Sequence, residues 1–162
     1  MTGEINKYKK IFIFGGPAVG KTTAAKRISK KYDFPLISLD KIMYDGNKKR
    51  EESEMSRILK KNLASYKSWV IEGGSIGWSD QLFKESDVVI ILEASLPTCL
   101  YRIIRRYIKE RKYTLLSTII FCLKILPKYY TKSLRHYHNN FHTKNVIKIN
   151  TNSFDKLNSV TL

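Results

Sequence analysis

One short stretch combines glycines, a lysine and a hydroxyl at the spacing that phosphate binding requires. Residues 15–22 read Gly-Gly-Pro-Ala-Val-Gly-Lys-Thr and fit the pattern G-x-x-x-x-G-K-[ST] at every fixed position. Glycines let successive backbone N–H groups curl into an anion-binding concavity. Lys21 can reach the β- and γ-phosphates of a nucleotide, and the Thr22 hydroxyl can ligate Mg²⁺. The pattern therefore predicts that the chain binds nucleotide phosphates together with a magnesium ion.

The residues around this loop predict the strand and the helix that such a loop needs. An apolar run, residues 10–14, leads into the loop, and a helical pattern, residues 23–28, leads out of it. The helix would direct its positive dipole end at the phosphates. The predicted nucleotide-binding residues are Gly15, Gly16, Pro17, Ala18, Val19, Gly20, Lys21, Thr22 and Thr23.

Asp40 follows a short predicted strand, residues 35–39. In open parallel sheets the carboxyl ends of the strands line the ligand crevice. A carboxylate there could hold an acceptor hydroxyl and take its proton during phosphoryl transfer. Asp40 could equally cap the helical segment that begins at Lys41, and the two roles do not exclude each other.

Two further acids end predicted strands. Glu72 closes the strand at residues 69–72, and in phosphate-loop enzymes a second strand ends in an acid, usually Asp, that holds the magnesium shell. Glu72 could serve Mg²⁺ in the same way through a water molecule, or it could cap a turn. Glu93 closes the strongly apolar run at residues 87–93, and it ranks below Glu72 for the magnesium role.

A basic stripe is predicted on a helix that Pro97 is placed to open. Apolar residues recur at helical spacing at Leu100, Ile103, Ile104, Tyr107 and Ile108, and basic residues recur beside them at Arg102, Arg105, Arg106 and Lys109. Arginine supplies fork-shaped donors to phosphate, so Arg102 and Arg106 could neutralise charge that develops during transfer. A solvated basic face is the alternative.

The length of 162 residues suits a single domain, residues 1–162, with a lid or insert at about residues 109–142. Two distant cysteines, Cys99 and Cys122, favour reduced thiols and a cytoplasmic location. The N-terminus has no signal-peptide pattern, and no apolar run is long enough to span a bilayer. His136, His138 and His142 lack an acid or cysteine cluster and are interpreted as surface residues.

The formal net charge of +16 favours an anionic partner. Between residues 94 and 154 the sequence has twelve Lys or Arg and one acid, Glu110. A segment rich in Tyr, Lys, His and Asn, residues 128–142, follows Pro127. Nucleic acid is therefore an alternative partner to nucleotides.

The remaining pattern alternates strands with helices. Helices are also predicted at residues 51–67, 79–84, 113–126 and 151–160, the last strand at residues 145–149, and a loop at residues 45–50. Gly73 and Gly74 could bring the backbone close to a substrate.

In this ordered combination the sequence resembles the phosphate-loop proteins named DNA topology modulation proteins, relatives of adenylate and shikimate kinases. The residues that carry the resemblance are 15–22, 38–41, 69–73 and 99–106. The resemblance implies a three-layer αβα fold with a five-stranded parallel sheet in the order 2-3-1-4-5, binding of ATP and Mg²⁺, and a helical lid that carries arginines. Glu72 and Gly74 depart from the family pattern, which commonly has Asp and Asn at these positions.

Two functions are compatible with these features. The first is a kinase that transfers the γ-phosphate of ATP to a small hydroxyl-bearing acceptor, with Lys21, Asp40, Arg102 and Arg106 as catalytic residues and Thr22 and Glu72 at the metal. The pattern Asp-Gly-Phe-Pro-Arg is missing after the third strand, so a nucleoside monophosphate acceptor is not expected. The second is a nucleic-acid-associated ATP-binding protein that affects DNA topology. A GTP switch is disfavoured because the motif Asn-Lys-x-Asp is missing.

Overall fold

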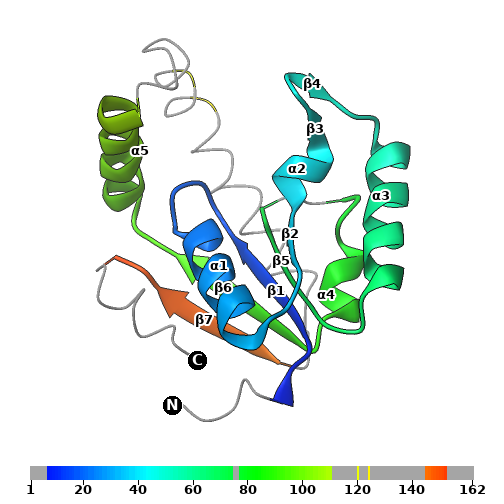
Figure 1. The fold of residues 1–162 in the computed structure, drawn as a ribbon. Helices are drawn as coiled ribbons and strands as arrows, with labels where there is room; N and C mark the ends of the chain where they lie inside the picture. The colour runs from blue at the N-terminus through cyan, green and yellow to red at the C-terminus, as the bar shows by residue number, and fades with distance from the viewer. Residues whose placement is uncertain (1–6, 75–76, 111–119, 121–123, 125–144, 153–162) are drawn as a thin grey trace.

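The structure is a computed structural model that describes residues 7–74, 77–110, 120, 124 and 145–152 (Figure 1). Strands and helices alternate along the chain, as the sequence predicts. Their bounds are β1 Lys10–Gly15, α1 Lys21–Tyr32, β2 Leu36–Ser38, α2 Leu39–Met43, β3 Tyr44–Asp45, β4 Lys48–Lys49, α3 Glu52–Ser65, β5 Trp69–Gly73, α4 Gln81–Glu85, β6 Val88–Glu93, α5 Leu96–Glu110 and β7 Val146–Asn150.

Five strands form one parallel sheet in the order β2-β5-β1-β6-β7. With the two strands of the small β3–β4 hairpin set aside, this is the predicted order 2-3-1-4-5. The central strand β1 therefore has a neighbour on each side, and its carboxyl end opens between β5 and β6. The fold class expected from the sequence is confirmed, and the phosphate-binding motif follows the central strand.

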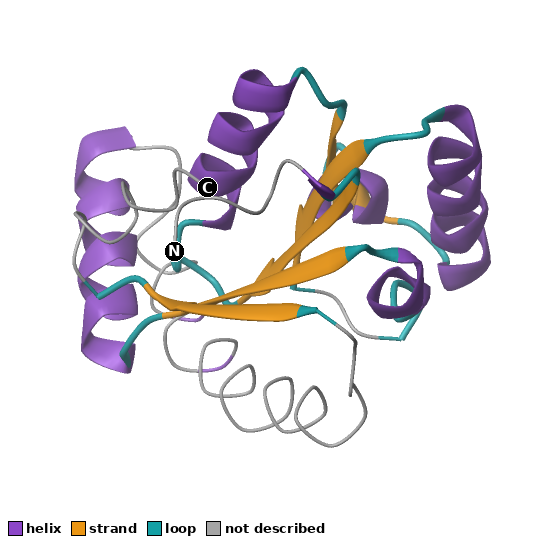
Figure 2. Ribbon diagram, turned by 90° about the horizontal axis from the view of Figure 1, so that it is seen from below, coloured by secondary structure: helices purple, strands orange, loops and turns teal. Residues whose placement is uncertain are grey.

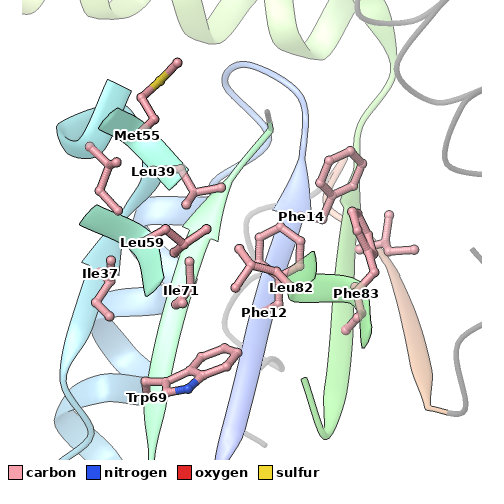
Figure 3. Close-up of a cluster of buried hydrophobic side chains, with 13 residues drawn as sticks. Phe12, Phe14, Ile37, Leu39, Met55, Leu59, Trp69, Ile71, Leu82 and Phe83 are labelled. Atoms are coloured by element: carbon pink, nitrogen blue, oxygen red, sulfur yellow. The ribbon is translucent and has the colours of Figure 1, made fainter. Parts of the chain in front are cut away.

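The sheet is covered by helices on both faces, which gives the three layers (Figure 2). Alternate residues of β1 divide between the two cores: Ile11 and Ile13 pack with residues of α1 and α5, whereas Phe12 and Phe14 pack on the opposite face. Figure 3 shows the second core, in which Phe12, Phe14 and Phe83 lie close together. A strand buried on both faces has a continuous apolar sequence, which is why β1 and β6 could be predicted from the sequence.

Residues 45–50, predicted as a loop, instead contain the tight antiparallel hairpin β3–β4. Asp45 pairs with Lys48, so the turn consists of Gly46 and Asn47, and Gly46 has a φ of +58°. Two-residue hairpins need such left-handed backbone, which glycine adopts at little cost. The Gly46-Asn47 pair was the local signal for this turn.

Much of the predicted lid, at about residues 109–142, lies outside the described residues. The same holds for Cys122, the three histidines and the helix predicted at 113–126. Thr151 and Asn152 begin the helix predicted at 151–160, but neither is helical in the structure, and the rest of it is not described. Among the residues that are described, no helix has the length and apolar character to cross a membrane.

Candidate active site

The phosphate-binding loop joins β1 to α1, as predicted, and two of its glycines are needed for different reasons. A Cβ atom at Gly15 would lie 2.6 Å from the backbone oxygen of Leu92 on β6, so this position has no room for a side chain. Gly20 has a φ of +98° and is the N-cap of α1. Ala18 also has a positive φ, +59°, a conformation that costs an L-residue roughly 1–2 kcal/mol.

Lys21 begins α1, and its Nζ atom donates a hydrogen bond of 2.7 Å to the Gly16 carbonyl. Part of the side chain keeps contact with solvent, but its surroundings are densely packed, and this burial lowers the pKa of Lys21. The carboxylates of Glu72 and Asp40 oppose that shift, and the guanidinium of Arg106 adds to it. Three charged groups predicted from distant parts of the sequence therefore lie within electrostatic reach of Lys21.

Glu72 is the buried centre of the predicted metal site, with 3% of its surface exposed. The Thr22 hydroxyl donates to its Oε2 at 3.4 Å, and the Ser38 hydroxyl donates to its Oε1 at 2.6 Å. Ser38 lies directly opposite Glu72 in the pairing of β2 with β5. The structure thus brings together the two residues, Thr22 and Glu72, that were predicted to serve Mg²⁺.

The donor chemistry of this site fits a magnesium ion held jointly with a nucleotide. Mg²⁺ takes oxygen ligands and is commonly bound through one or two carboxylates plus substrate phosphates. Thr22 and Glu72 supply a hydroxyl and a carboxylate side by side. Among the described residues there is no group of three or more His, Cys, Asp or Glu that could hold a metal ion. Phosphate oxygens and water would therefore have to complete the ligand set.

Glu93, the alternative acid, lies on the other side of the central strand. It ends β6 and pairs with Asn150 of β7, whereas Glu72 is the penultimate residue of β5 and aligns with Ile13 of β1. The Glu93 backbone carbonyl accepts a 2.7 Å hydrogen bond from the Thr151 N–H. The contact with Thr22 favours Glu72 as the acid at the metal.

Asp40 lies in the first turn of α2, directly after β2, and its side chain is exposed. Ser38, not Asp40, is the N-cap of this helix, so the alternative role of Asp40 as an N-cap is wrong. The reason is that the helix starts at Leu39, two residues earlier than the capping role requires. Asp40 keeps its predicted place at the carboxyl end of a strand, within electrostatic reach of Lys21.

Gly73 leaves room for Leu39, the residue that precedes Asp40. A Cβ atom at Gly73 would lie 2.6 Å from the Cβ of Leu39, the residue before Asp40. Leu39 is fully buried in the second core (Figure 3). The backbone at Gly73 therefore approaches this leucine closely. The sequence had suggested that it would approach a substrate.

The basic helix α5 contributes two arginines with different surroundings. Arg106 is exposed and acts electrostatically on Lys21. Arg102 is half-buried; its Nη1 donates to the Ala18 carbonyl at 3.2 Å, and its Nη2 donates to the Thr151 carbonyl. Arg102 thus contacts the backbone of the loop. Of the apolar stripe, Leu100 and Ile103 pack on the first core, while Ile104 and Ile108 are 50% and 67% exposed.

The other predicted loop residues also follow β1 in sequence order. Gly16 and Val19 are buried, Pro17 is half-buried, and Thr23 is exposed on the first turn of α1. Cys99 is a buried thiol on α5.

Two residues of the site were not predicted. Ser38 bonds to Glu72, and the buried Thr151 donates its hydroxyl to the Val19 carbonyl at 2.9 Å. Both lie at the carboxyl end of a strand, β2 and β7 respectively. The rule that singled out Asp40 and Glu72 would have found them if it had been applied to hydroxyl residues as well as acids.

Several known proteins are similar to this chain in sequence or in fold. A family model described as an AAA domain matches residues 14–73, which contain the loop, Asp40 and Glu72. An uncharacterized protein of Bacillus subtilis (strain 168), YqaC, is 31% identical over 86 residues, or 52% of this chain. The chain spans about half of that relative, 48% of its length.

Two named kinases are also similar. An adenylate kinase of Encephalitozoon cuniculi (strain GB-M1) is 25% identical over 119 residues, which cover 62% of this chain and 67% of that protein. The crystal structure of a shikimate kinase from Acinetobacter baumannii, solved in complex with shikimate, superposes with a TM-score of 0.62 and 15% identity. The superposition covers 93% of this chain and 88% of that one.

The chain therefore has a kinase-type phosphate-loop fold, and the broader resemblance to adenylate and shikimate kinases is confirmed. The narrower resemblance to DNA topology modulation proteins stays a prediction. A nucleic-acid partner also stays a prediction, because the basic segment at residues 128–142 lies outside the described residues.

Proposed function

We propose that this protein is a phosphotransferase that moves the γ-phosphate of ATP to a hydroxyl group of a small acceptor. One observation carries the proposal. Lys21 of the phosphate-binding loop is acted on by Asp40, Glu72 and Arg106, which come from three other elements. Phosphoryl transfer needs positive charge on the phosphates, an acid for the metal and a group for the acceptor hydroxyl in one place.

Lys21 and the arginines of α5 serve the donor end of the reaction. The ammonium of Lys21 binds the β- and γ-phosphates, and the guanidinium of Arg106 neutralises charge that develops during transfer. Thr22 and Glu72 would hold Mg²⁺ as oxygen donors. When bound, the ion would neutralise negative charge on the phosphate oxygens.

Asp40 serves the acceptor end. Its exposed carboxylate accepts a hydrogen bond from the acceptor hydroxyl, orients its oxygen toward the γ-phosphorus and takes the proton as the new bond forms. Similar proteins are named for different acceptors, adenylate and shikimate. The acceptor is therefore sought among small metabolites, nucleosides and nucleotides alike.

The test is a screen of purified protein with Mg-ATP and a panel of hydroxyl-bearing compounds, with phosphorylated products detected by mass spectrometry. Lys21→Met removes the ammonium from the loop and provides the inactive background. Lys26→Met, an exposed lysine on the same helix, is the matched control.

A product that wild type and Lys26→Met form, and that Lys21→Met does not form, supports the proposal. ATP binding without transfer to any member of a broad panel would contradict it. Transfer that survives in Lys21→Met would point to a contaminating kinase and would also count against the proposal.

A further inference from the structure

A buried threonine outside the sequence motif bonds to the phosphate-binding loop. Thr151 follows β7 and is completely buried. Its Oγ1 lies 2.9 Å from the Val19 carbonyl oxygen and 3.1 Å from the Glu93 carbonyl oxygen, and its N–H donates to the same Glu93 carbonyl. The threonine therefore joins the end of β6 to the loop. Thr151 and Val19 are 132 residues apart in the sequence.

Arg102 joins the same two regions from α5. Its Nη1 donates to the Ala18 carbonyl at 3.2 Å and lies 3.4 Å from Thr151 Oγ1, and its Nη2 donates to the Thr151 carbonyl. The guanidinium thus bridges the loop and the end of β7 with its two terminal nitrogens. A planar fork can do this in one orientation, whereas an ammonium is a single point of contact.

The directions of the Ala18 and Val19 carbonyls determine the directions of the N–H groups that follow them in the chain. In a trans peptide the C=O and the following N–H point in opposite directions. A carbonyl held outward at Ala18 turns the Val19 N–H inward, and one held outward at Val19 turns the Gly20 N–H inward. These two N–H groups belong to the concavity that binds phosphate.

The start of α5 is attached to the same strand end. The Asn152 side chain accepts a 2.6 Å hydrogen bond from the Ser95 N–H, just before α5 begins. The start of α5, which carries Arg102, is therefore attached to the segment that contains Thr151. Ala18 needs such support because its positive φ is unfavourable for alanine.

We propose that Arg102 and Thr151 are positioning residues that hold the Ala18 and Val19 carbonyls outward, and so direct the Val19 and Gly20 N–H groups at the nucleotide phosphates. The inference rests on the proposed nucleotide binding. It gives Arg102 a role on the loop backbone, where the sequence suggested a contact with phosphate.

The experiment measures dissociation constants for ADP and for adenosine by titration calorimetry. Thr151→Val removes the hydroxyl at nearly constant volume, and we expect ADP to bind about five- to tenfold more weakly. Thr151→Ser keeps the hydroxyl and should stay within about twofold of wild type. Adenosine binding should change little in either variant, because adenosine carries no phosphate.

Arg102→Lys distinguishes a positioning role of Arg102 from a role of its charge alone. If Arg102 only supplied charge to the phosphates, lysine would preserve ADP affinity. We expect instead a loss of about three- to tenfold, because lysine cannot bridge two carbonyls in the same way. Arg57→Lys, an exposed position on α3, is the matched control and should bind ADP as wild type does.

Ala18→Gly provides the decisive comparison. Glycine adopts positive φ without the penalty that alanine carries. The loss caused by Thr151→Val or Arg102→Lys should therefore shrink at least about twofold when Ala18→Gly is combined with it. A residue that merely stabilises the fold would show no such coupling in ADP affinity.

Equal ADP affinity in wild type, Thr151→Val and Arg102→Lys would overturn the inference, as would equal losses with and without Ala18→Gly. Thermal unfolding of each variant is recorded, and if Thr151→Val does not fold, the Arg102→Lys pair decides. ADP binding by wild type without phosphoryl transfer would defeat the proposed kinase and leave this inference standing. A wild type that binds no ADP defeats both.

Discussion

The two ends of the candidate site are constructed differently. At the donor end, the loop between β1 and α1 has Gly16 and Val19 buried, and its backbone carbonyls accept hydrogen bonds from Lys21, Arg102 and Thr151. At the acceptor end, Asp40 is exposed on the five-residue helix α2, next to the exposed β3–β4 hairpin. In the view of Figure 1, α5 lies on one side of the loop and α2 with its hairpin on the other.

This difference follows from what each end binds. Phosphate binding depends on backbone amides, whose directions must be held by many contacts. Acceptor binding depends on a few exposed side chains, which can change without disturbing a core. We therefore expect substitutions at the donor end to weaken nucleotide binding, and substitutions at the acceptor end to weaken transfer alone.

The largest expected effect is at Asp40. Asp40→Asn removes the proton acceptor and should lower turnover on the order of a hundredfold to ten thousandfold, while the dissociation constant of ATP changes less than about twofold. Initial rates and nucleotide titrations measure the two quantities. Asp33→Asn, at an exposed C-cap of α1 whose positive φ asparagine also tolerates, is the control and should leave both unchanged. Full turnover in Asp40→Asn would end the assignment of Asp40 to the acceptor.

The next prediction compares two glycines. Alanine at Gly15 meets a backbone oxygen of β6, and alanine at Gly73 meets Leu39, each at 2.6 Å, so both changes should lower the free energy of unfolding by about 1–3 kcal/mol. Gly15→Ala should also weaken ATP binding, whereas Gly73→Ala should raise the KM for the acceptor by moving α2.

Denaturant titrations and steady-state kinetics would check this pair, with each variant as the control for the other. If both variants changed the same kinetic constant, the separation of donor and acceptor ends would be lost.

A smaller effect concerns pH. Burial lowers the pKa of Lys21, so its ammonium is lost at a lower pH than that of an ordinary lysine. The neutral form is favoured in the folded protein, so this group makes the free protein more stable as pH rises from the lowered pKa to the ordinary one. Nucleotide binding should do the opposite and weaken in that window, by up to about tenfold per pH unit.

Nucleotide titrations between about pH 7 and 10 would follow the change. Lys21→Arg keeps its charge throughout this range, so its binding should not fall in the window. A wild type and a Lys21→Arg variant with the same pH profile would show that the loss arises from another group.

The smallest effect is expected at Arg50, which bonds to residues of α2 and β3 at the acceptor end. Its Nη1 donates to the carbonyls of Ile42 at 3.0 Å and Tyr44 at 2.9 Å, and its Nη2 pairs with Asp45 at 3.2 Å. Arg50→Gln should cost about 1 kcal/mol of stability and raise the acceptor KM a few-fold.

Thermal unfolding and acceptor kinetics test this prediction, with ATP affinity as the internal reference. A change in ATP affinity larger than the change in acceptor KM would contradict it.

The loop and the approximate bounds of most elements were predicted from the residues because their signals are local, whereas the sheet order was implied by the family resemblance. β1 and β6 have continuous apolar runs, and the loop motif is contiguous. Asp40 and Glu72 were found because acids at the carboxyl ends of parallel strands meet at one edge. The hairpin at Tyr44–Asp45 and Lys48–Lys49 was missed because residues 45–50, which are polar and contain Gly46, were interpreted as a loop.

The sequence by itself determined where the phosphates of a nucleotide would bind, because an unbroken strand, loop and helix carry that information within some twenty residues. Only the tertiary structure decided how the loop is held and what each charged residue contacts. Arg102 reaches Ala18 across 84 residues, and Thr151 reaches Val19 across 132. Such contacts depend on strand register and on the direction of a helix over the sheet, and these follow from the packing of two cores rather than from any local pattern.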